Sequence, residues 1–235
     1  MKPGRTPKGT QPEPTRYYEE FLLAYLRGRT GDTTLVTLED GLAAVSLYGL
    51  ERDVNKFHRK PTLPRVKRVI EILQGLPGLK PVSLVDVGCG RGTALWPMME
   101  ALPHTSFTGI DAYEGRSKDL WAMKAAGITQ LNVPFHLEAE NLEGIGANNF
   151  DCATILEVLE HLPEGGPEKA AREVLRVTRR AVVFSVPSVK DYNPDHLRLY
   201  TEGQLRNLWL AAGAKRVEIH TDIPKHFVGV AYVEG

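Results

Sequence analysis

The sequence has few cysteines and no long apolar run. Its two cysteines, Cys89 and Cys152, stand in apolar surroundings and form neither a Cys-x-x-Cys pair nor a regular disulfide framework, which is typical of a reducing compartment. No stretch approaches the roughly 18 consecutive apolar residues of a membrane span. The Pro-, Thr- and Lys-rich start also lacks the apolar core of a signal peptide. These absences predict a cytoplasmic protein without a membrane partner.

An excess of one charge is missing as well. The 29 Lys and Arg residues equal the 29 Asp and Glu residues, so the formal net charge is zero. This balance gives no long-range electrostatic support for a polyanionic partner, and nucleic acid is therefore not the expected ligand. The 235 residues, of which 42% are hydrophobic, suffice for one sizeable globular domain with a small accessory segment.

The first third of the chain predicts a flexible tail followed by short accessory helices. Residues 1–16 carry almost no apolar side chains that could offset the entropy of ordering, so we expect a tail there. Residues 17–80 repeat apolar side chains at helical spacing, and Thr37 with Asp40 forms a capping-box pattern. Pro64 is suited to the first position of a further helix.

From residue 81 to the end, strand-like and helical patterns alternate, which predicts an α/β fold with a parallel sheet. Five strands are predicted from the segments SLVDV, FTGID, NVPFHLEAE, FDCATILEV and AVVFSV. Helices are expected from Thr93, around 116–126 and after the capping-box residue Thr201. The last two strand patterns, RVEIHTD and HFVGVAYV, are separated by a few residues around Pro224. This gap is too short for a crossover helix, so the two should pair antiparallel.

Three alternating glycines follow the first of these strands, in the stretch VDVGCGRG. A dinucleotide fingerprint has the spacing G-x-G-x-x-G, but here Gly92 comes one place too early after Gly88 and Gly90. Asp86 would repel a pyrophosphate and would suit an ammonium group. Asp111 ends the second strand, where a carboxylate can accept hydrogen bonds from both hydroxyls of a ribose. The pattern therefore predicts a ligand with a ribose and a cationic part.

These elements resemble the class I S-adenosylmethionine-dependent methyltransferases. The resemblance covers about residues 82–235 and includes the Asp-x-Gly-x-Gly-x-Gly turn, the acid after the second strand, the acidic turn after the third strand and the final hairpin. It implies a Rossmann-like, seven-stranded, mostly parallel sheet with a terminal antiparallel hairpin. Residues 81–235 would form the methyltransferase domain, and the accessory helices in 17–80 would cap its cofactor cleft.

The resemblance also assigns parts of the cofactor, S-adenosyl-L-methionine, to residues of this chain. Asp86 would hold the methionine ammonium, and Asp111 would bind the ribose hydroxyls. After the third strand the family commonly has an Asp, whereas this chain reads LEAENL, so Glu138 would face the adenine, with Glu140 as the alternative. The cofactor-binding set implied in this way is Asp86, Gly88, Cys89, Gly90, Gly92, Asp111, Ala112, Glu138, Ala139, Glu140 and Leu156.

Past the fourth strand, Glu157, Glu160 and His161 stand at i, i+3 and i+4, so a helical turn would place them on one face. The stretch LEVLEHLP resembles a motif of ubiquinone-biosynthesis-type O-methyltransferases and of small-RNA 2′-O-methyltransferases. In the small-RNA enzymes a similar set, completed by a later histidine, binds a divalent metal, which makes His196 the candidate fourth ligand of a magnesium ion. Three hypotheses stay open for His161: a general base, a metal ligand, or a hydrogen-bond partner of the lid backbone over residues 189–199.

The sequence therefore predicts methyl transfer to an oxygen of a small-molecule acceptor, with His161, Glu157 and Glu160 as catalytic residues. An oxygen acceptor is favoured because a hydroxyl needs a nearby base more than a thiolate does. One alternative is metal-dependent 2′-O-methylation of RNA, which the neutral charge disfavours. Another is a catalytically idle, cofactor-binding partner of a second subunit.

Overall fold

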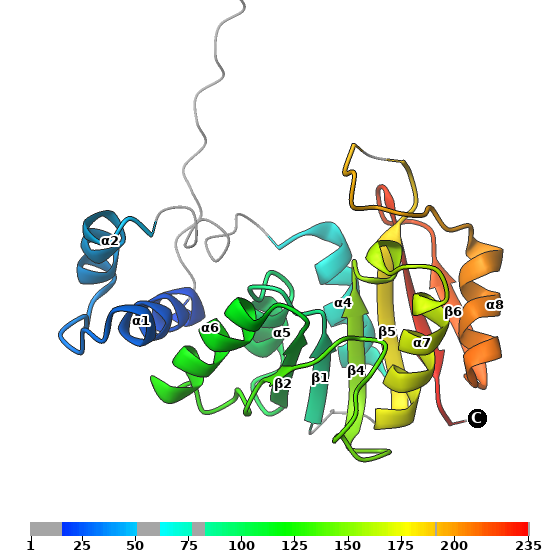
Figure 1. The fold of residues 1–235 in the computed structure, drawn as a ribbon, viewed down its shortest axis with the longest axis horizontal. Coiled ribbons are helices and arrows are strands. Elements are labelled where there is room, and N and C mark those ends of the chain that lie inside the picture. The colour runs from blue at the N-terminus through cyan, green and yellow to red at the C-terminus, as the bar shows by residue number, and fades with distance from the viewer. Residues whose placement is uncertain (1–15, 51–61, 77–82, 191, 235) are drawn as a thin grey trace, which may run out of the picture.

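A computed structural model describes residues 16–50, 62–76, 83–190 and 192–234. In this part of the chain, seven strands form one sheet in the order β3-β2-β1-β4-β5-β7-β6 (Figure 1). The neighbours among β1 to β5 pair in parallel. The strands are β1 Ser83–Val87, β2 Ser106–Asp111, β3 Phe135–His136, β4 Phe150–Leu156, β5 Thr178–Pro187, β6 Arg216–His220 and β7 His226–Tyr232.

The end of the chain forms the predicted antiparallel hairpin. Strand β7 pairs antiparallel with both β5 and β6, so Ala231 lies opposite Val182 on one side and Val217 on the other. Five residues, 221–225, join β6 to β7, which leaves no room for the helix that a parallel connection requires. The predicted Rossmann-like architecture, mostly parallel with one antiparallel hairpin, is confirmed.

Helices cover both faces of the sheet because each strand alternates its side chains between the two faces. Leu84 packs into a hydrophobic cluster with helices of one face, whereas its neighbour Val85 packs into the cluster of the other face. The first cluster includes α4 Pro64–Gly75, α5 Leu95–Ala101 and α6 Glu114–Ala125. The second includes α7 Gly166–Val177 and α8 Glu202–Ala212.

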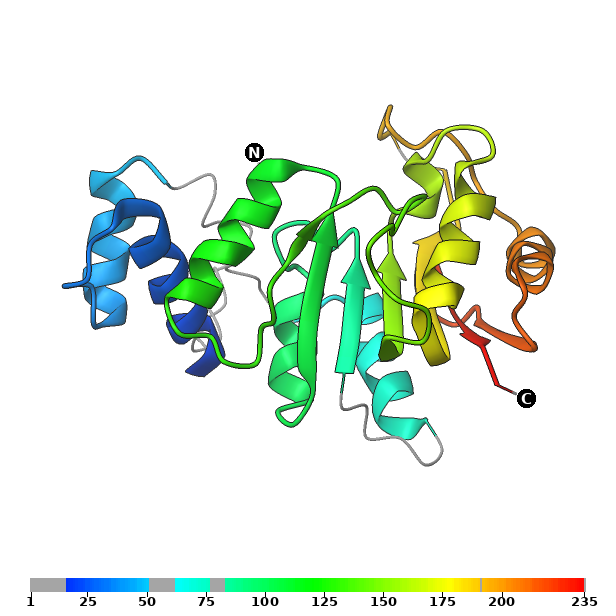
Figure 2. The same ribbon diagram turned by 60° about the horizontal axis from the view of Figure 1, so that its bottom comes forward.

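Two N-terminal helices, α1 Arg16–Thr30 and α2 Leu38–Leu47, lie at the end of the molecule opposite α8 (Figures 1 and 2). Helix α1 packs against α6, and α2 packs against α1. Helix α1 approaches α6 closely because Gly28 has no side chain, and a Cβ there would lie 2.3 Å from the Cβ of Ala122. The capping box of Thr37 and Asp40 is present at the start of α2. The predicted tail lies outside the described residues except for Arg16, the first residue of α1.

Some predicted boundaries were wrong. The third strand was expected over NVPFHLEAE, but β3 contains only Phe135 and His136, because Pro134 lacks the N–H that a ladder needs. The helix expected from Thr93 begins at Leu95. Among the described helices, none has the length and apolar character needed to cross a bilayer.

Candidate active site

The glycine turn leaves β1 with three left-handed residues in alternation. Gly88, Gly90 and Gly92 have φ of 74°, 57° and 83°, a region that other residues enter at a cost. A Cβ on Gly88 would lie 2.3 Å from Val158 Cγ2, and one on Gly92 would lie 2.0 Å from the ring of Trp96. A Cβ on Gly90 would meet nothing within 4 Å. The outer glycines are therefore required by packing, and the middle one borders open space where a ligand could approach the backbone.

Asp111 lies directly across this turn, as its position at the end of β2 predicts. Its carboxylate is 3% exposed and accepts hydrogen bonds from the N–H of Gly90 at 2.8 Å and of Tyr113 at 2.9 Å. Arg116 Nη1 lies 3.3 Å from each carboxylate oxygen, and its guanidinium stacks on the Tyr113 ring. The carboxylate is thus fixed in orientation at the rim of the glycine turn.

Asp86 is a buried acid beneath the same turn. Its side chain is 2% exposed, and Thr154 on β4 donates a hydrogen bond of 2.7 Å to Oδ1. Burial raises the pKa of Asp86 to about 7, the hydrogen bond from Thr154 opposes this, and the charge of Asp111 adds to the rise. A buried carboxyl of this kind gains from a cation beside it, which is the property expected of a group that receives an ammonium.

The residues predicted to surround the adenine differ in their exposure. Glu138 is exposed and Ala139 is buried. Glu140 turns toward α7, where Oε2 is buried without a hydrogen-bond partner among the described residues and Oε1 lies near Gly166. Ala112 follows Asp111, and its carbonyl oxygen lies 2.8 Å from Nε2 of His136. Of the two acids, Glu138 is the more exposed, whereas Glu140 lines a surface pocket together with residues of α7.

Two further residues of the predicted cofactor set have limited access. Burial raises the pKa of the Cys89 thiol well above its ordinary value, which agrees with a packing role and not with a nucleophile. Leu156 is half-buried at the last position of β4.

The sequence predicted that Glu157, Glu160 and His161 share one face of a helical turn. This prediction is wrong for Glu157. Glu157 has φ of +57°, and the helix that follows is a short 3₁₀ turn, η1 Leu159–His161. The N–H of Glu157 donates to the Ser185 carbonyl at 2.9 Å, and the chain then turns through a left-handed residue. Because no α-helix begins at Glu157, the i, i+3, i+4 relation does not apply to it.

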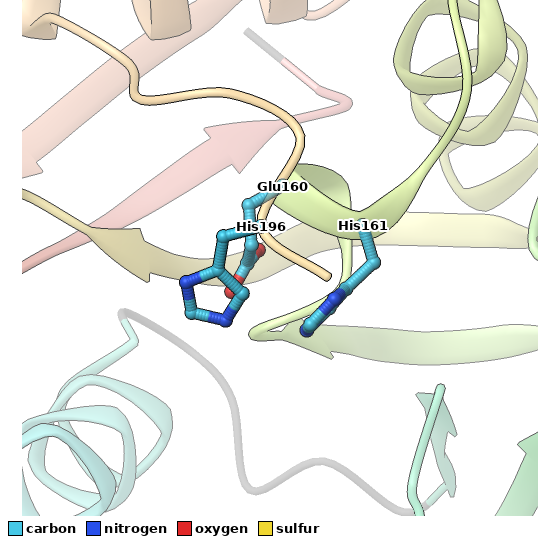
Figure 3. Close-up of side chains that lie close together, drawn as sticks. All are labelled: Glu160, His161 and His196. Atoms are coloured by element: carbon cyan, nitrogen blue, oxygen red, sulfur yellow. The ribbon is translucent and has the colours of Figure 1, made fainter. Parts of the chain in front are cut away.

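Glu160, His161 and His196 do come together (Figure 3). Each offers a ligand atom, and these atoms lie within 4.8 Å of one another. Glu160 is fully buried, and the two imidazole rings meet edge to face with centroids 4.7 Å apart. Nδ1 of His161 lies 2.9 Å from the carbonyl oxygen of Asp195. Since a carbonyl can only accept, Nδ1 carries the hydrogen, and in the neutral ring Nε2 is then the nitrogen with the lone pair.

The loop between β5 and α8 brings His196 to this group and is held by the backbone of η1. Leu197 N–H donates to the Glu160 carbonyl at 2.9 Å, and Arg198 Nη2 donates to the Leu162 carbonyl at 2.6 Å. The contact from His161 to Asp195 belongs to the same set. His161 therefore makes the lid-backbone hydrogen bond that was one of its three predicted roles.

A family model described as a methyltransferase domain matches residues 85–183. This match begins within β1 and ends within β5, and it includes both Asp86 and Asp111 and the EVLEH stretch. Residues 85–183 therefore form a methyltransferase domain, in agreement with the predicted resemblance to the class I S-adenosylmethionine-dependent methyltransferases. A domain of this type implies S-adenosylmethionine as the cofactor.

The methyltransferase has curated relatives with different acceptors. A ubiquinone biosynthesis O-methyltransferase from Aromatoleum aromaticum is 32% identical over 102 residues, which are 40% of this chain and 39% of that protein. A release factor glutamine methyltransferase from Caulobacter vibrioides is 25% identical over 185 residues, or 67% of this chain. The chain spans 60% of the length of this second relative.

A solved structure of a SAM-dependent methyltransferase from Aquifex aeolicus shares the fold of this methyltransferase. The TM-score is 0.60 at 20% identity, and the match covers 74% of this chain and 94% of the other. At this identity the likeness concerns the fold alone.

One group at the same sheet edge was missed by the sequence analysis. His226 Nε2 lies 3.2 Å from Glu157 Oε2, and Ser185 Oγ donates to Glu157 Oε1 at 2.8 Å. Burial raises the pKa of Glu157, but the hydrogen bond from His226 and the charge of Arg65 outweigh it and hold the pKa below its ordinary value. The same hydrogen bond raises the pKa of His226. No spacing in the sequence could reveal this group, because its members come from separate elements.

Proposed function

We propose that this methyltransferase transfers the methyl group of S-adenosylmethionine to an oxygen of a small-molecule acceptor. The observation that carries the proposal is His161, whose Nδ1 is fixed on the Asp195 carbonyl and which lies beside Glu160 and His196. This group follows β4, next to the strand that leads into the glycine turn. The O-methyltransferase among the relatives supports an oxygen acceptor, although the glutamine methyltransferase has a different one.

In this proposal the residues around the glycine turn hold the cofactor. Asp86 receives the methionine ammonium, Asp111 accepts the ribose hydroxyls, and the bare backbone at Gly90 lies against the cofactor. Glu138 and Ala139 face the adenine. The cofactor supplies a methyl group already activated on a sulfonium, so the protein's tasks are to align the acceptor and exclude water. The lid loop after β5 and the N-terminal helices are the elements proposed to close over the reactants.

His161 is the proposed general base. Its Nδ1–H is fixed on the Asp195 carbonyl, which sets the ring orientation and leaves Nε2 to take the proton of the acceptor hydroxyl. The ring is half-buried, so part of it stays accessible. The same hydrogen bond ties the base to the lid loop.

A metal-assisted form of the reaction is the second candidate. The convergence of Glu160, His161 and His196 favours it, because a carboxylate with two imidazoles can hold a divalent cation that lowers the pKa of a bound hydroxyl. Glu157, the fourth candidate ligand, lies outside this group and faces His226. Magnesium prefers oxygen ligands, so this donor set fits it less well than the four-residue set that the sequence suggested.

The test is an acceptor screen that reads release of S-adenosylhomocysteine. With an acceptor in hand, His161→Ala should keep cofactor binding and lose about a hundredfold or more in kcat, the usual worth of positioned proton transfer. His104→Ala, a change of an exposed histidine, is the control.

Chelator separates the two mechanisms. Loss of activity with chelator and its return with magnesium or manganese would establish the metal, and Glu160→Gln and His196→Ala should then share the defect of His161→Ala. Chelator-resistant turnover rejects the metal. A fully active His161→Ala enzyme rejects both mechanisms and leaves the histidine a structural residue of the lid.

A further inference from the structure

Side chains from three elements meet at the side chain of Glu157. Ser185 on β5 donates to Oε1 at 2.8 Å, and His226 at the start of β7 lies 3.2 Å from Oε2. Arg65, in the first turn of α4, places Nε 3.8 Å from the same oxygen. Packing of α4 against β5 and β7 brings these residues together from positions far apart in the chain.

The ring of His226 joins Glu157 to the backbone of the hairpin. Nδ1 lies 2.9 Å from the carbonyl oxygen of Pro224, and Nε2 lies 3.2 Å from Oε2 of Glu157. Because contacts on both nitrogens fix the orientation of the ring, His226 can hold the Glu157 carboxylate in one position.

Glu157 keeps capacity for another hydrogen bond. An ionised carboxylate has about four lone-pair sites, and one hydrogen bond reaches each oxygen, from Ser185 and His226. The side chain is 21% exposed, and those of Arg65 and His226 are each 22% exposed. The group is therefore held by its partners and still partly exposed to solvent.

Glu157 lies at the edge of the sheet where the candidate cofactor-binding residues also stand. Glu157 follows β4, and the next residue, Val158, packs in the space that Gly88 leaves by having no Cβ. In doubly wound sheets ligands bind beyond the carboxyl ends of the central strands. Left-handed backbone at a residue other than glycine, as at Glu157, persists where surrounding contacts enforce it and is frequent at functional sites.

We propose that Glu157 binds a hydrogen-bond donor of the methyl acceptor, and that His226 is the positioning residue that fixes this carboxylate. The acceptor is then a molecule with a hydroxyl or ammonium group that Glu157 can hold. This inference rests on the proposed function, since it concerns the acceptor of the same reaction. It assigns roles to His226, Arg65 and Ser185 that the EVLEH motif does not contain.

The experiment compares kcat and KM for the acceptor identified in the screen with the Kd for S-adenosylhomocysteine. Glu157→Gln and His226→Phe should each raise the acceptor KM by roughly tenfold or more, the worth of a charged hydrogen bond, with the cofactor Kd within about twofold of wild type. His226→Gln should recover most of the loss, because its amide N–H can still donate to Glu157. The double variant should have an acceptor KM no higher than that of either single variant, because both changes remove the same feature, the Glu157 carboxylate held by His226.

His220→Phe is the control, since His220 is the other histidine of the same hairpin. Ser185→Ala removes a single hydrogen bond and serves as the milder variant if His226→Phe folds poorly. Unchanged acceptor KM in Glu157→Gln, or equal losses for acceptor and cofactor, would overturn the inference and leave the group a structural tie. Absence of turnover in the wild-type enzyme would instead reject the proposed function, and with it this inference.

Discussion

Asp86 combines deep burial with a place at the ligand-binding edge of the sheet. Its pKa of about 7 comes from burial, against which Thr154 supplies one hydrogen bond and Asp111 adds a like charge. Burial favours the protonated form of this carboxyl, whereas the ionised form is stabilised only if a cation lies nearby. The ammonium of S-adenosylmethionine would meet this need in the proposed complex.

Without the cofactor, Asp86 should make stability fall as pH rises. Its folded pKa is above the ordinary value, so its contribution to stability is greatest at low pH and is lost as the pH rises through about 7. Between pH 5.5 and 8 the loss is about 2 kcal/mol, from roughly one and a half pKa units at about 1.4 kcal/mol each. The measurement is chemical denaturation of wild type and Asp86→Asn at both pH values. Relative to Asp86→Asn, the unfolding free energy of wild type should fall by this amount between the lower and the higher pH. A difference that stays constant over this range contradicts the buried-acid description.

Single residues also mark the limit of inference from sequence. The positions of Asp86 and Asp111 beside the glycine turn were predictable, because strand ends and glycine spacing fix where their side chains lie. The contact of His161 with the lid backbone was one of the roles that the sequence suggested. The partners of Glu157 were not predictable, because they depend on how β5, β7 and α4 pack together.

At the scale of elements, the glycine turn shows how one short segment serves two purposes. At Gly88 and Gly92 there is no room for a side chain, because Val158 and Trp96 occupy the space where a Cβ would lie. Gly90 is an open position whose N–H holds Asp111. Packing and ligand access are thus divided among alternate residues of the turn.

Replacement of these glycines should separate stability from binding. Gly88→Ala forces a clash with Val158 besides the left-handed strain, so it should lower the unfolding free energy by more than the roughly 1–2 kcal/mol of the strain alone. Gly90→Ala introduces the left-handed strain but no clash. It should still weaken S-adenosylhomocysteine binding by about tenfold or more, because the added methyl group projects into the open space beside the turn. Thermal unfolding and calorimetry measure the two effects.

Gly203→Ala is the control for both variants, because Gly203 lies in α8 with nothing near its Cβ position. It should bind the cofactor normally. Full cofactor affinity in Gly90→Ala would show that the open face of the turn is not the binding surface.

Elements with strong local signals were predicted well. The capping boxes at Thr37 and Thr201 are present, and so is the final hairpin. Local signals failed where tertiary contacts decide the conformation. The EVLEH stretch has helical spacing, but the hydrogen bond from Glu157 to the Ser185 carbonyl sets a left-handed turn instead.

At the scale of the whole molecule, strand order explains why distant segments share one site. The central position of β1, between β2 and β4, puts the glycine turn between Asp111 and the EVLEH stretch. The lid loop after β5 then reaches back to η1 through Leu197 and Arg198. This topology was predictable from the alternation of strand and helix patterns, because parallel strands with helical crossovers allow few arrangements. The acceptor was not, because the segments proposed to contact it carry no recognisable motif.

The most direct test of the account is calorimetric titration of the purified chain with S-adenosylhomocysteine and with NAD. The account predicts that S-adenosylhomocysteine binds and NAD does not, because the turn with Asp86 and Asp111 suits a ribose and an ammonium and not a pyrophosphate. Asp111→Asn should weaken S-adenosylhomocysteine by about ten- to hundredfold, the worth of its charged hydrogen bonds. Binding of NAD without S-adenosylhomocysteine, or an unchanged affinity in Asp111→Asn, would contradict the proposed cofactor site.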